Sequence, residues 1–261
     1  MKAWRWLACA LLGVVGPAVA DDDSPAELVI ERRGQDVVAY AVNRLAGPVE
    51  VELNALELVD MANDTALPLR QVLPPRARVR LVRLTALSAN ARQSLRLDAT
   101  AGEPGQVARD VVYSLPVDER RFELGQGFHG GFSHQDRANR YAVDLIVPEG
   151  TPVLAARAGV VMQAEGNFRE GGVDPALANR ANLIRVLHED GSMALYAHLQ
   201  PDGVFVRPGD TVSLGQVIGR TGNTGYSSGP HLHFAVQVNA GLALAAIPFR
   251  MVGPAGFLPL E

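Results

Sequence analysis

Two histidines separated by a single residue, His231 and His233, follow a segment rich in glycine and serine. Side chains alternate between the two faces of a β-strand, so in a strand both imidazoles lie on one face while Leu232 and Phe234 pack on the other. Two imidazoles placed in this way can bind one metal ion. An isolated pair of this kind more often lies on a solvated strand face. A metal site therefore needs further candidate ligands elsewhere in the chain.

Three residues upstream of this pair have suitable chemistry. His134 and Asp144 lie beside apolar, strand-like sequence, and His198 lies within the segment Leu195–Leu199. Zinc hydrolases commonly hold the ion through three nitrogen or carboxylate ligands, leave one position open to water, and use other histidines for proton transfer. Together with the histidine pair, these residues indicate metal-assisted hydrolysis.

The candidate residues belong to longer motifs. These motifs are Tyr196-Ala197-His198-Leu199, Gly229-Pro230-His231-Leu232-His233-Phe234, Gly150-Thr151-Pro152-Val153, Ala158-Gly159-Val160-Val161, Arg207-Pro208-Gly209-Asp210-Thr211-Val212 and Gly215-Gln216-Val217-Ile218-Gly219. With them, the chain from about residue 125 to residue 250 resembles the LytM/lysostaphin-type M23 family of zinc metallopeptidases. The resemblance implies a mostly antiparallel β-sheet peptidase domain with a narrow groove and zinc at the floor of that groove.

Carried over by position, the resemblance implies that His134, Asp144 and His233 hold one Zn²⁺ per chain, and that His198 and His231 are unligated catalytic histidines. It also implies that a zinc-activated water attacks a peptide carbonyl. Two neutral imidazoles and one carboxylate suit this chemistry, because they leave the ion a net positive charge that lowers the pKa of its water. We assign His231 as the general base and His198 as the stabiliser of the oxyanion. The two roles could be exchanged, because the sequence places neither ring relative to a substrate.

The first two ligands have competitors in the sequence. In the family's familiar pattern the aspartate follows the first histidine closely, whereas Asp144 follows His134 at ten residues, so an inserted loop is expected here. His129 is the competing first ligand and Asp136 the competing carboxylate. We prefer His134 with Asp144, because an unpaired carboxylate inside a hydrophobic strand pattern would be costly and a metal ion would compensate for it. His129 could instead be an ordinary surface histidine with no role in metal binding.

Residues 1–20 have the pattern of a signal peptide. Lys2 and Arg5 precede an apolar run, Leu7–Val19, and small residues end at Ala20. The run is shorter than the roughly 20 residues that a membrane-spanning helix needs, and it contains glycine and proline. We therefore predict export, cleavage near Ala20, a periplasmic or secreted location, and no stable membrane span after cleavage.

Composition limits the partners and the source of stability. The formal net charge of the whole chain is −4, and removing Lys2 and Arg5 makes it more negative, so nucleic-acid binding is not expected. Cys9 is the only cysteine and would leave with the signal peptide, so an ordinary hydrophobic core rather than a disulfide must stabilise the exported chain.

The fold class predicted for the exported chain is all-β, in two domains. Residues 21–118 are expected to form an accessory domain, and residues 119–261 the M23-type peptidase domain. The strands expected in the first domain are Leu28–Ile30, Val37–Val42, Val49–Leu53, Arg78–Val82, Ser94–Leu97 and Val111–Tyr113. Short alternating strands at this spacing favour an immunoglobulin-like β-sandwich. Such a domain could orient the enzyme, recruit cell-wall enzymes or cover the groove.

Two features are expected in the second domain. Ile184–Leu187 and Met193–Tyr196 are expected to form a hairpin around the turn at Asp190-Gly191. Residues 167–180 show little periodicity, so we expect a long loop on the groove wall.

The sequence thus predicts an exported zinc metallo-endopeptidase that hydrolyses peptide cross-links of bacterial peptidoglycan, with D-alanyl–diaminopimelate bonds as the natural target in a diderm periplasm. One alternative is a non-hydrolytic LytM-type activator of cell-wall amidases. Such relatives typically lack ligands or catalytic histidines, whereas all five positions are filled here. A second alternative is a secreted protease that acts on glycine-rich proteins.

Overall fold

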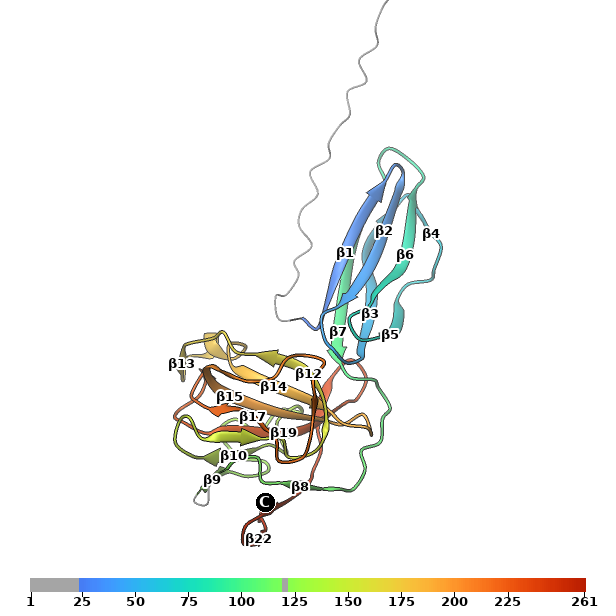
Figure 1. Ribbon diagram of the computed structural model, residues 1–261. Coiled ribbons are helices and arrows are strands. Elements are labelled where there is room, and N and C mark those ends of the chain that lie inside the picture. Colours follow the sequence, from blue (N-terminus) through green and yellow to red (C-terminus); the bar gives the residue numbers. More distant parts are fainter. Residues whose placement is uncertain (1–23, 119–121) are drawn as a thin grey trace, which may run out of the picture.

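A computed structural model describes residues 24–118 and 122–261, and these residues are built almost entirely from β-strands (Figure 1). The one regular helix assigned within them is a 3₁₀ turn, η1 (Pro175–Leu177). The predicted all-β fold class is therefore confirmed. The predicted signal peptide, Cys9 and the predicted boundary at residue 119 lie outside the described residues. No helix in the described ranges is long and apolar enough to cross a membrane.

The N-terminal strands form two facing sheets (Figure 1). The first has the order β1 (Ala26–Arg33), β2 (Asp36–Asn43), β6 (Arg78–Ala86), β4 (Met61–Asn63), and the second the order β5 (Leu69–Leu73), β3 (Val49–Val59), β7 (Arg92–Ala101). Alternation along these strands buries one face of each sheet, so Val51 and Leu53 are fully enclosed. A two-sheet sandwich is present as expected, and its assignment as immunoglobulin-like stays a prediction.

The C-terminal strands form one large, mostly antiparallel sheet. The strand order along its main path is β16 (Thr211–Val212), β12 (Gly159–Glu165), β14 (Asn182–Leu187), β15 (Met193–Val204), β19 (Leu232–Asn239), β10 (Val143–Ile146) and β9 (Glu123–Gln126). Three further strands pair with members of this path or with one another, namely β11 (Pro152–Leu154), β17 (Val217–Thr221) and β20 (Leu244–Ala246). The predicted hairpin is confirmed, since β14 and β15 pair from Leu187 opposite Met193 onward.

The two faces of this sheet have different environments. Side chains such as Tyr196 and Phe234 point into the main hydrophobic core, where they are fully buried. The alternate residues point to the other face, where Ala197, Leu195 and Ala235 form a small separate apolar cluster. The period of two therefore sends Phe234 into the core and its neighbour His233 to the opposite face, as the sequence predicts.

One N-terminal strand packs differently from the expectation. The segment Val111–Tyr113, expected in the sandwich, contributes to β8 (Val112–Ser114), which pairs with β21 (Arg250–Gly253) near the C-terminus. β22 (Gly256–Phe257) completes this small sheet. Tyr113 and Leu115 lie in the C-terminal core. Periodicity identifies a strand but not its partner, so the sequence could not assign this one to its sheet.

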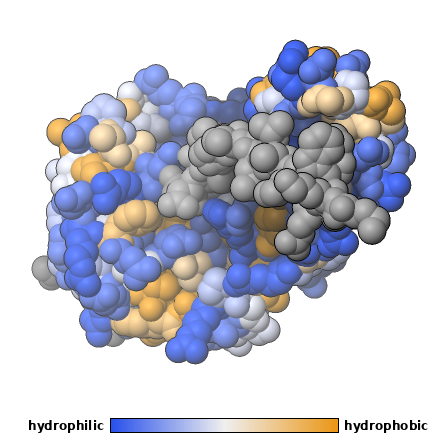
Figure 2. All heavy atoms as spheres, turned by 90° about the horizontal axis from the view of Figure 1, so that it is seen from above, coloured by the Kyte–Doolittle hydropathy of each residue, from blue (hydrophilic) through white to orange (hydrophobic). Residues whose placement is uncertain are grey.

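The sandwich and the large sheet share a buried contact. Met162 and Met193 of the sheet lie in the same hydrophobic cluster as sandwich residues. Beside them, Glu50 is 2% exposed and accepts hydrogen bonds from Asn239 Nδ2 at 2.9 Å and from Leu242 N at 2.7 Å. Glu50 also pairs with Arg70 Nε at 2.5 Å within the sandwich, so the donors Asn239 and Leu242 add hydrogen bonds between the two parts to a carboxylate that is already paired. Figure 2, a view from above, shows a surface of mostly hydrophilic residues with apolar groups between them.

Candidate metal centre

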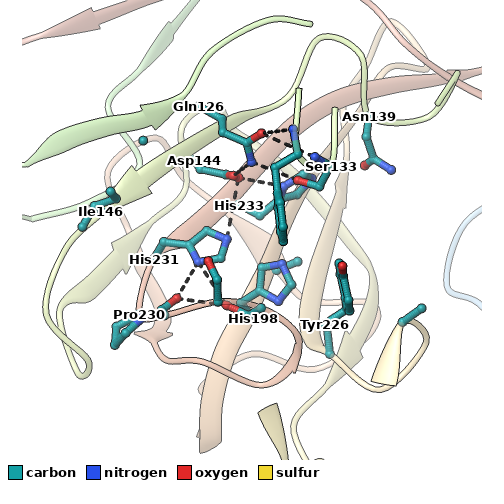
Figure 3. A pocket seen from close by; sticks show the side chains of 18 of the residues that line it. Gln126, Ser133, Asn139, Asp144, Ile146, His198, Tyr226, Pro230, His231 and His233 are labelled. Carbon is teal, nitrogen blue, oxygen red and sulfur yellow. Dashed lines mark hydrogen bonds and ion pairs between the residues drawn. The ribbon is translucent and has the colours of Figure 1, made fainter. Parts of the chain in front are cut away.

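Asp144 on β10 lies directly opposite His233 on the neighbouring strand β19. This register places the side chains of Asp144 and His233 on the groove face (Figure 3). His134 reaches them from the loop that precedes β10. Asp144 Oδ1 lies 3.2 Å from His134 Nε2 and 3.0 Å from His233 Nδ1. The structure thus brings together the three residues that the sequence singled out as candidate ligands.

These three side chains have the geometry and the chemistry of a zinc site. One ligand atom from each lies within 4.8 Å of the others, and all three residues are buried. A tetrahedral zinc ion with bonds of about 2.0–2.1 Å separates its ligand atoms by roughly 3.3 Å, close to the two spacings at Asp144. Two imidazoles and one carboxylate also form a donor set that zinc prefers. The residues therefore fit a zinc ion.

Neighbouring groups fix the orientation of the ligand atoms. His134 Nδ1 lies 2.9 Å from the Gly127 carbonyl oxygen, so Nδ1 carries the proton and Nε2 is left to face the cluster. Gln126 Nε2 donates to Asp144 Oδ2 at 2.7 Å and to Ser133 Oγ at 3.0 Å. Such outer contacts hold metal ligands in position and tune their basicity.

Sequence reasoning missed Gln126. It lies in the segment Gly125–Gly130, where no spacing or motif marks a residue that supports a metal ligand. Its role becomes visible only because β9 pairs with β10, with Gln126 opposite Asp144.

The charge state of the cluster follows from its contacts. Burial would raise the pKa of Asp144, but hydrogen bonds from His134 and His233 outweigh it and hold this pKa well below its ordinary range. Burial alone would lower the pKa of His134, whereas its hydrogen bond to Asp144 raises it. An ionised carboxylate at the centre of the cluster is the state that binds a cation.

His231 stands next to the cluster as the residue before β19. Its Nδ1 lies 2.8 Å from the Gly229 carbonyl oxygen and therefore carries a proton in the neutral ring. The unprotonated Nε2 lies 3.7 Å from Asp144 Oδ1 (Figure 3). The ring is thus set with a proton-accepting nitrogen toward the candidate metal position.

His198 reaches the same cavity through an irregularity in β15. Leu183 pairs with Ala197 and Asn182 with Leu199, so His198 is the extra residue of a β-bulge. Its φ is +63°, a left-handed conformation that is unusual for a residue with a side chain. Ala197 points to the groove face, so in a regular strand the next residue, His198, would point to the core. The bulge turns His198 into the groove instead.

The environment of His198 keeps its ring neutral. Burial, followed by the nearby His231 and His233, lowers the pKa of His198 to about 3. Its Nδ1 lies 2.7 Å from the Thr224 carbonyl oxygen, so this nitrogen carries the proton and Nε2 is an acceptor. The rings of His198 and His231 lie 4.6 Å apart. Both histidines therefore present the same kind of nitrogen next to the cluster.

The two competing ligands lie outside the cluster. His129 is exposed and packs its ring edge-on against Tyr141 at 4.9 Å. Asp136 accepts hydrogen bonds from the backbone of Ala138 and Asn139 and from the Asn139 side chain, so it stabilises the turn after His134. Neither residue belongs to the three that converge.

A cavity of about 730 Å³ opens above the cluster. Small and apolar side chains, including Ala197 and Leu183, lie along it, and Phe132 stacks on Tyr226 at a ring distance of 5.9 Å. The expected loop at residues 167–180 contains η1 and β13 (Gly171–Gly172), which pairs with β18 (Gly225–Tyr226). Ala178 of this loop lines the cavity, as expected for a groove wall.

Three convergent side chains that could hold a metal ion lie at the floor of a groove, with two further histidines beside them, and this arrangement is typical of metallohydrolases. Residues 138–243 match the model of a family described as Peptidase family M23. The chain therefore contains an M23 peptidase domain. Asp144, His198, His231 and His233 lie within the matched residues, and His134 lies shortly before them.

Known proteins resemble the same part of the chain. The peptidoglycan DD-endopeptidase ShyC of Vibrio cholerae is 32% identical over 139 residues, which cover 52% of this chain and 29% of that protein. Lysostaphin of Staphylococcus staphylolyticus is 37% identical over 115 residues, which cover 44% of this chain and 20% of lysostaphin. The solved catalytic domain of lysostaphin from Staphylococcus simulans is 30% identical and aligns with 49% of this chain and 88% of its own, with a TM-score of 0.36. The chain thus spans less than a third of the length of these two curated relatives.

Proposed function

We propose that the protein is an exported zinc metallo-endopeptidase that hydrolyses the peptide cross-links of bacterial peptidoglycan. The observation that carries this proposal is the convergence of His134, Asp144 and His233 beside two catalytic-type histidines at the floor of an open groove. The names of relatives add support, because ShyC is called a peptidoglycan DD-endopeptidase and Mpg of Neisseria meningitidis a DD-carboxypeptidase/endopeptidase.

In this proposal His134 Nε2, Asp144 Oδ1 and His233 Nδ1 hold the zinc ion. When bound, zinc supplies Lewis acidity and brings the pKa of water toward neutrality. His134 keeps its ligand nitrogen free because its other nitrogen donates to Gly127, and Gln126 keeps the Asp144 carboxylate in place. For zinc binding, the protein thus supplies a negatively charged set of ligand atoms that is held in a fixed orientation.

His231 is the proposed general base. Its Nδ1 proton is committed to the Gly229 carbonyl oxygen, so the lone pair on Nε2 can accept the proton of the attacking water. The same nitrogen can then deliver that proton to the departing amine of the peptide. Its distance of 3.7 Å from Asp144 Oδ1 places it beside the ligand cluster.

His198 is the proposed stabiliser of the oxyanion. Because its Nδ1 proton is committed to Thr224, His198 can donate to an oxyanion only after Nε2 has gained a proton. Before that, the neutral ring accepts a hydrogen bond at Nε2 and can orient the water or the substrate amide. In both rings Nδ1 donates to a backbone carbonyl oxygen and Nε2 is the acceptor. The assignment of base and stabiliser therefore rests on the proximity of His231 to the cluster, and substitution of each histidine in turn tests it.

The remaining parts of the proposal concern the location and the substrate. Residues 1–20 would direct export and be removed near Ala20, residues 21–118 would form the accessory domain, and residues 119–261 the peptidase domain, with β8 of the first segment packing in the peptidase core. A groove lined by small side chains suits thin peptides such as those of the bacterial wall. The accessory domain could also contact other cell-wall enzymes.

Digestion of purified peptidoglycan tests this proposal. The mature protein is loaded with one equivalent of zinc, and the released muropeptides are identified by mass spectrometry, with His231→Ala as the control. We expect the cross-linked dimers to be converted to monomers by the intact protein only. If the zinc-loaded protein cleaves no cross-link but activates a cell-wall amidase, it would instead be a regulator of other enzymes.

A further inference from the structure

A second cavity, of about 910 Å³, lies where the N-terminal sandwich meets the large sheet. Leu45 and Arg76 line it from the sandwich, and Gln163, Arg185 and Gln237 line it from the sheet. We call it the junction cavity. It adjoins the groove above the candidate metal centre, because Leu183 and Leu195 are among the residues that line both.

The strand register defines the place of Arg185 relative to the candidate metal centre. On the groove face of the sheet, one row of paired residues contains Leu183, Ala197 and His233, and the next row contains Arg185, Leu195 and Ala235. Paired residues point to the same face, so Arg185 lies on the face of the candidate metal centre. It is one row nearer to the sandwich.

The charge of Arg185 lacks a carboxylate partner among the described residues. Its side chain is enclosed, with 7% of the residue exposed, and Nη1 donates to Gln237 Oε1 while Nε has no hydrogen-bond partner. Gln237 is itself fixed, because its Nε2 donates to the Ala138 carbonyl oxygen at 2.8 Å. An enclosed cation whose only hydrogen bond is to a neutral amide is costly, and a carboxylate would remove that cost.

The lining of the cavity limits the anion that it can accept. The described lining residues include two other arginines, Arg44 and Arg76, and one carboxylate, Glu165. Arg44 already pairs with Glu27 at 3.1 Å. A planar guanidinium that makes no ion pair among the described residues suits a single carboxylate. The peptides of the proposed substrate carry such carboxylates.

We propose that the junction cavity is a substrate subsite in which Arg185 binds a free carboxylate of the peptide, one row away from the metal centre and on its sandwich side. The inference rests on the proposed function, because it identifies the part of the wall peptide that lies beyond the bond that is cleaved. It also gives the N-terminal sandwich a part in specificity, since the sandwich supplies one wall of the subsite.

The test compares two forms of one cross-linked wall peptide, which differ only in a terminal carboxylate that is free in one form and a primary amide in the other. Binding to the zinc-loaded, full-length His231→Ala protein is measured by calorimetry, so that hydrolysis does not interfere. Hydrolysis by the otherwise unchanged protein is measured in parallel. We expect the amide to bind at least about tenfold more weakly, the scale of a lost hydrogen bond to a charged group.

Variants then assign the preference to this residue. Arg185→Met should abolish the preference for the carboxylate, and Arg185→Lys should retain part of the preference. Arg32→Met, at an exposed arginine of the sandwich, is the matched control and should keep the full preference. Circular dichroism and thermal unfolding show whether each variant is folded. The comparison of the two peptides in the protein with unmodified Arg185 does not depend on any Arg185 variant.

Equal binding of the carboxylate and the amide, or a preference that persists in folded Arg185→Met, overturns the subsite. If the peptides are cleaved without any preference, the proposed function stands and the subsite fails. If the preference is found but neither peptide is cleaved, the subsite stands and the proposed hydrolysis fails.

Discussion

Gln126 Nε2 donates a 2.7 Å hydrogen bond to Asp144 Oδ2, the carboxylate oxygen that faces away from the two ligand histidines. The same Gln126 side chain accepts from the backbone N–H of Phe132 through Oε1 at 3.0 Å. One side chain thus links the carboxylate on β10 to the loop that carries His134. The mutual positions of the candidate ligands depend on this contact.

We expect Gln126→Leu to weaken zinc binding by about 10- to 100-fold, the usual effect of losing an outer-shell partner of a metal ligand. Zinc affinity is measured by competition with a chromophoric chelator. Gln135→Leu is the control, because the Gln135 side chain donates to the Gly131 carbonyl oxygen on the exposed side of the same loop. Equal zinc affinity in Gln126→Leu and the unmodified protein would show that Asp144 needs no support from this residue.

Zinc should stabilise the folded protein, because the buried donor set exists only in the native state. At a zinc concentration 100 times the Kd, the stabilisation is about 2.7 kcal/mol. We expect chelation to lower the Tm and zinc to restore it. His233→Ala should lose this response, whereas His198→Ala should keep it. A zinc-dependent Tm that survives in His233→Ala would remove this residue from the ligand set.

Loss of a proton-transferring histidine should reduce turnover without releasing the metal. We expect His231→Ala to bind one zinc per chain and to lose about 10²- to 10⁴-fold in kcat, the usual contribution of general acid–base catalysis. The readouts are zinc content and the cleavage rate. We expect the loss of kcat to be larger in His231→Ala than in His198→Ala. The reverse pattern would exchange the two roles.

Stability at mildly acidic pH should depend on His188, which lies far from the candidate metal centre. Burial lowers the pKa of His188 to about 4, and its Nδ1 lies 2.9 Å from the Ala158 carbonyl oxygen. Between the ordinary value of 6.5 and about 4, the unfolded chain binds a proton at His188 that the folded chain does not. The contribution is therefore fully present above pH 6.5 and is lost as the pH falls toward 4, by about 3 kcal/mol in total.

His188→Asn keeps a side-chain N–H for the Ala158 carbonyl but has no proton to gain. We expect its free energy of unfolding to fall less steeply between pH 6.5 and 4 than that of the unmodified protein, as measured by urea titration at several pH values. Contributions from other groups appear in both proteins and cancel in the difference. Identical slopes would mean that His188 has the same pKa in the folded and the unfolded state.

The groove wall should tolerate no side chain at Gly171. A Cβ at this position would lie 1.6 Å from the Asn223 carbonyl oxygen, because β13 runs directly beside β18. We expect Gly171→Ala to cost about 1–3 kcal/mol of stability and to lower peptide cleavage by moving the wall that carries Tyr226. Gly131→Ala is the control, since a Cβ added at Gly131 would meet no atom within 4 Å. Equal stability of the two variants would show that this wall shifts without cost.

The sequence determined the chemistry and the local structure of this protein. The spacing of His231 and His233 placed both rings on one strand face, and the hydrophobic pattern around Asp144 indicated a buried carboxylate in need of a partner. The hairpin of β14 and β15 followed from alternation and from the turn at Asp190-Gly191. These features depend on periods of two residues and on turn residues, which are local properties of a chain.

The tertiary structure decided which of the distant residues meet. It separated His134 from the competing His129, and it turned His198 into the groove through a bulge that alternation alone would not predict. It assigned β8 to the C-terminal core and placed Gln126 on Asp144. Sheet register, strand partners and the contact between the two parts of the chain join residues far apart in sequence, and no local pattern encodes those pairings.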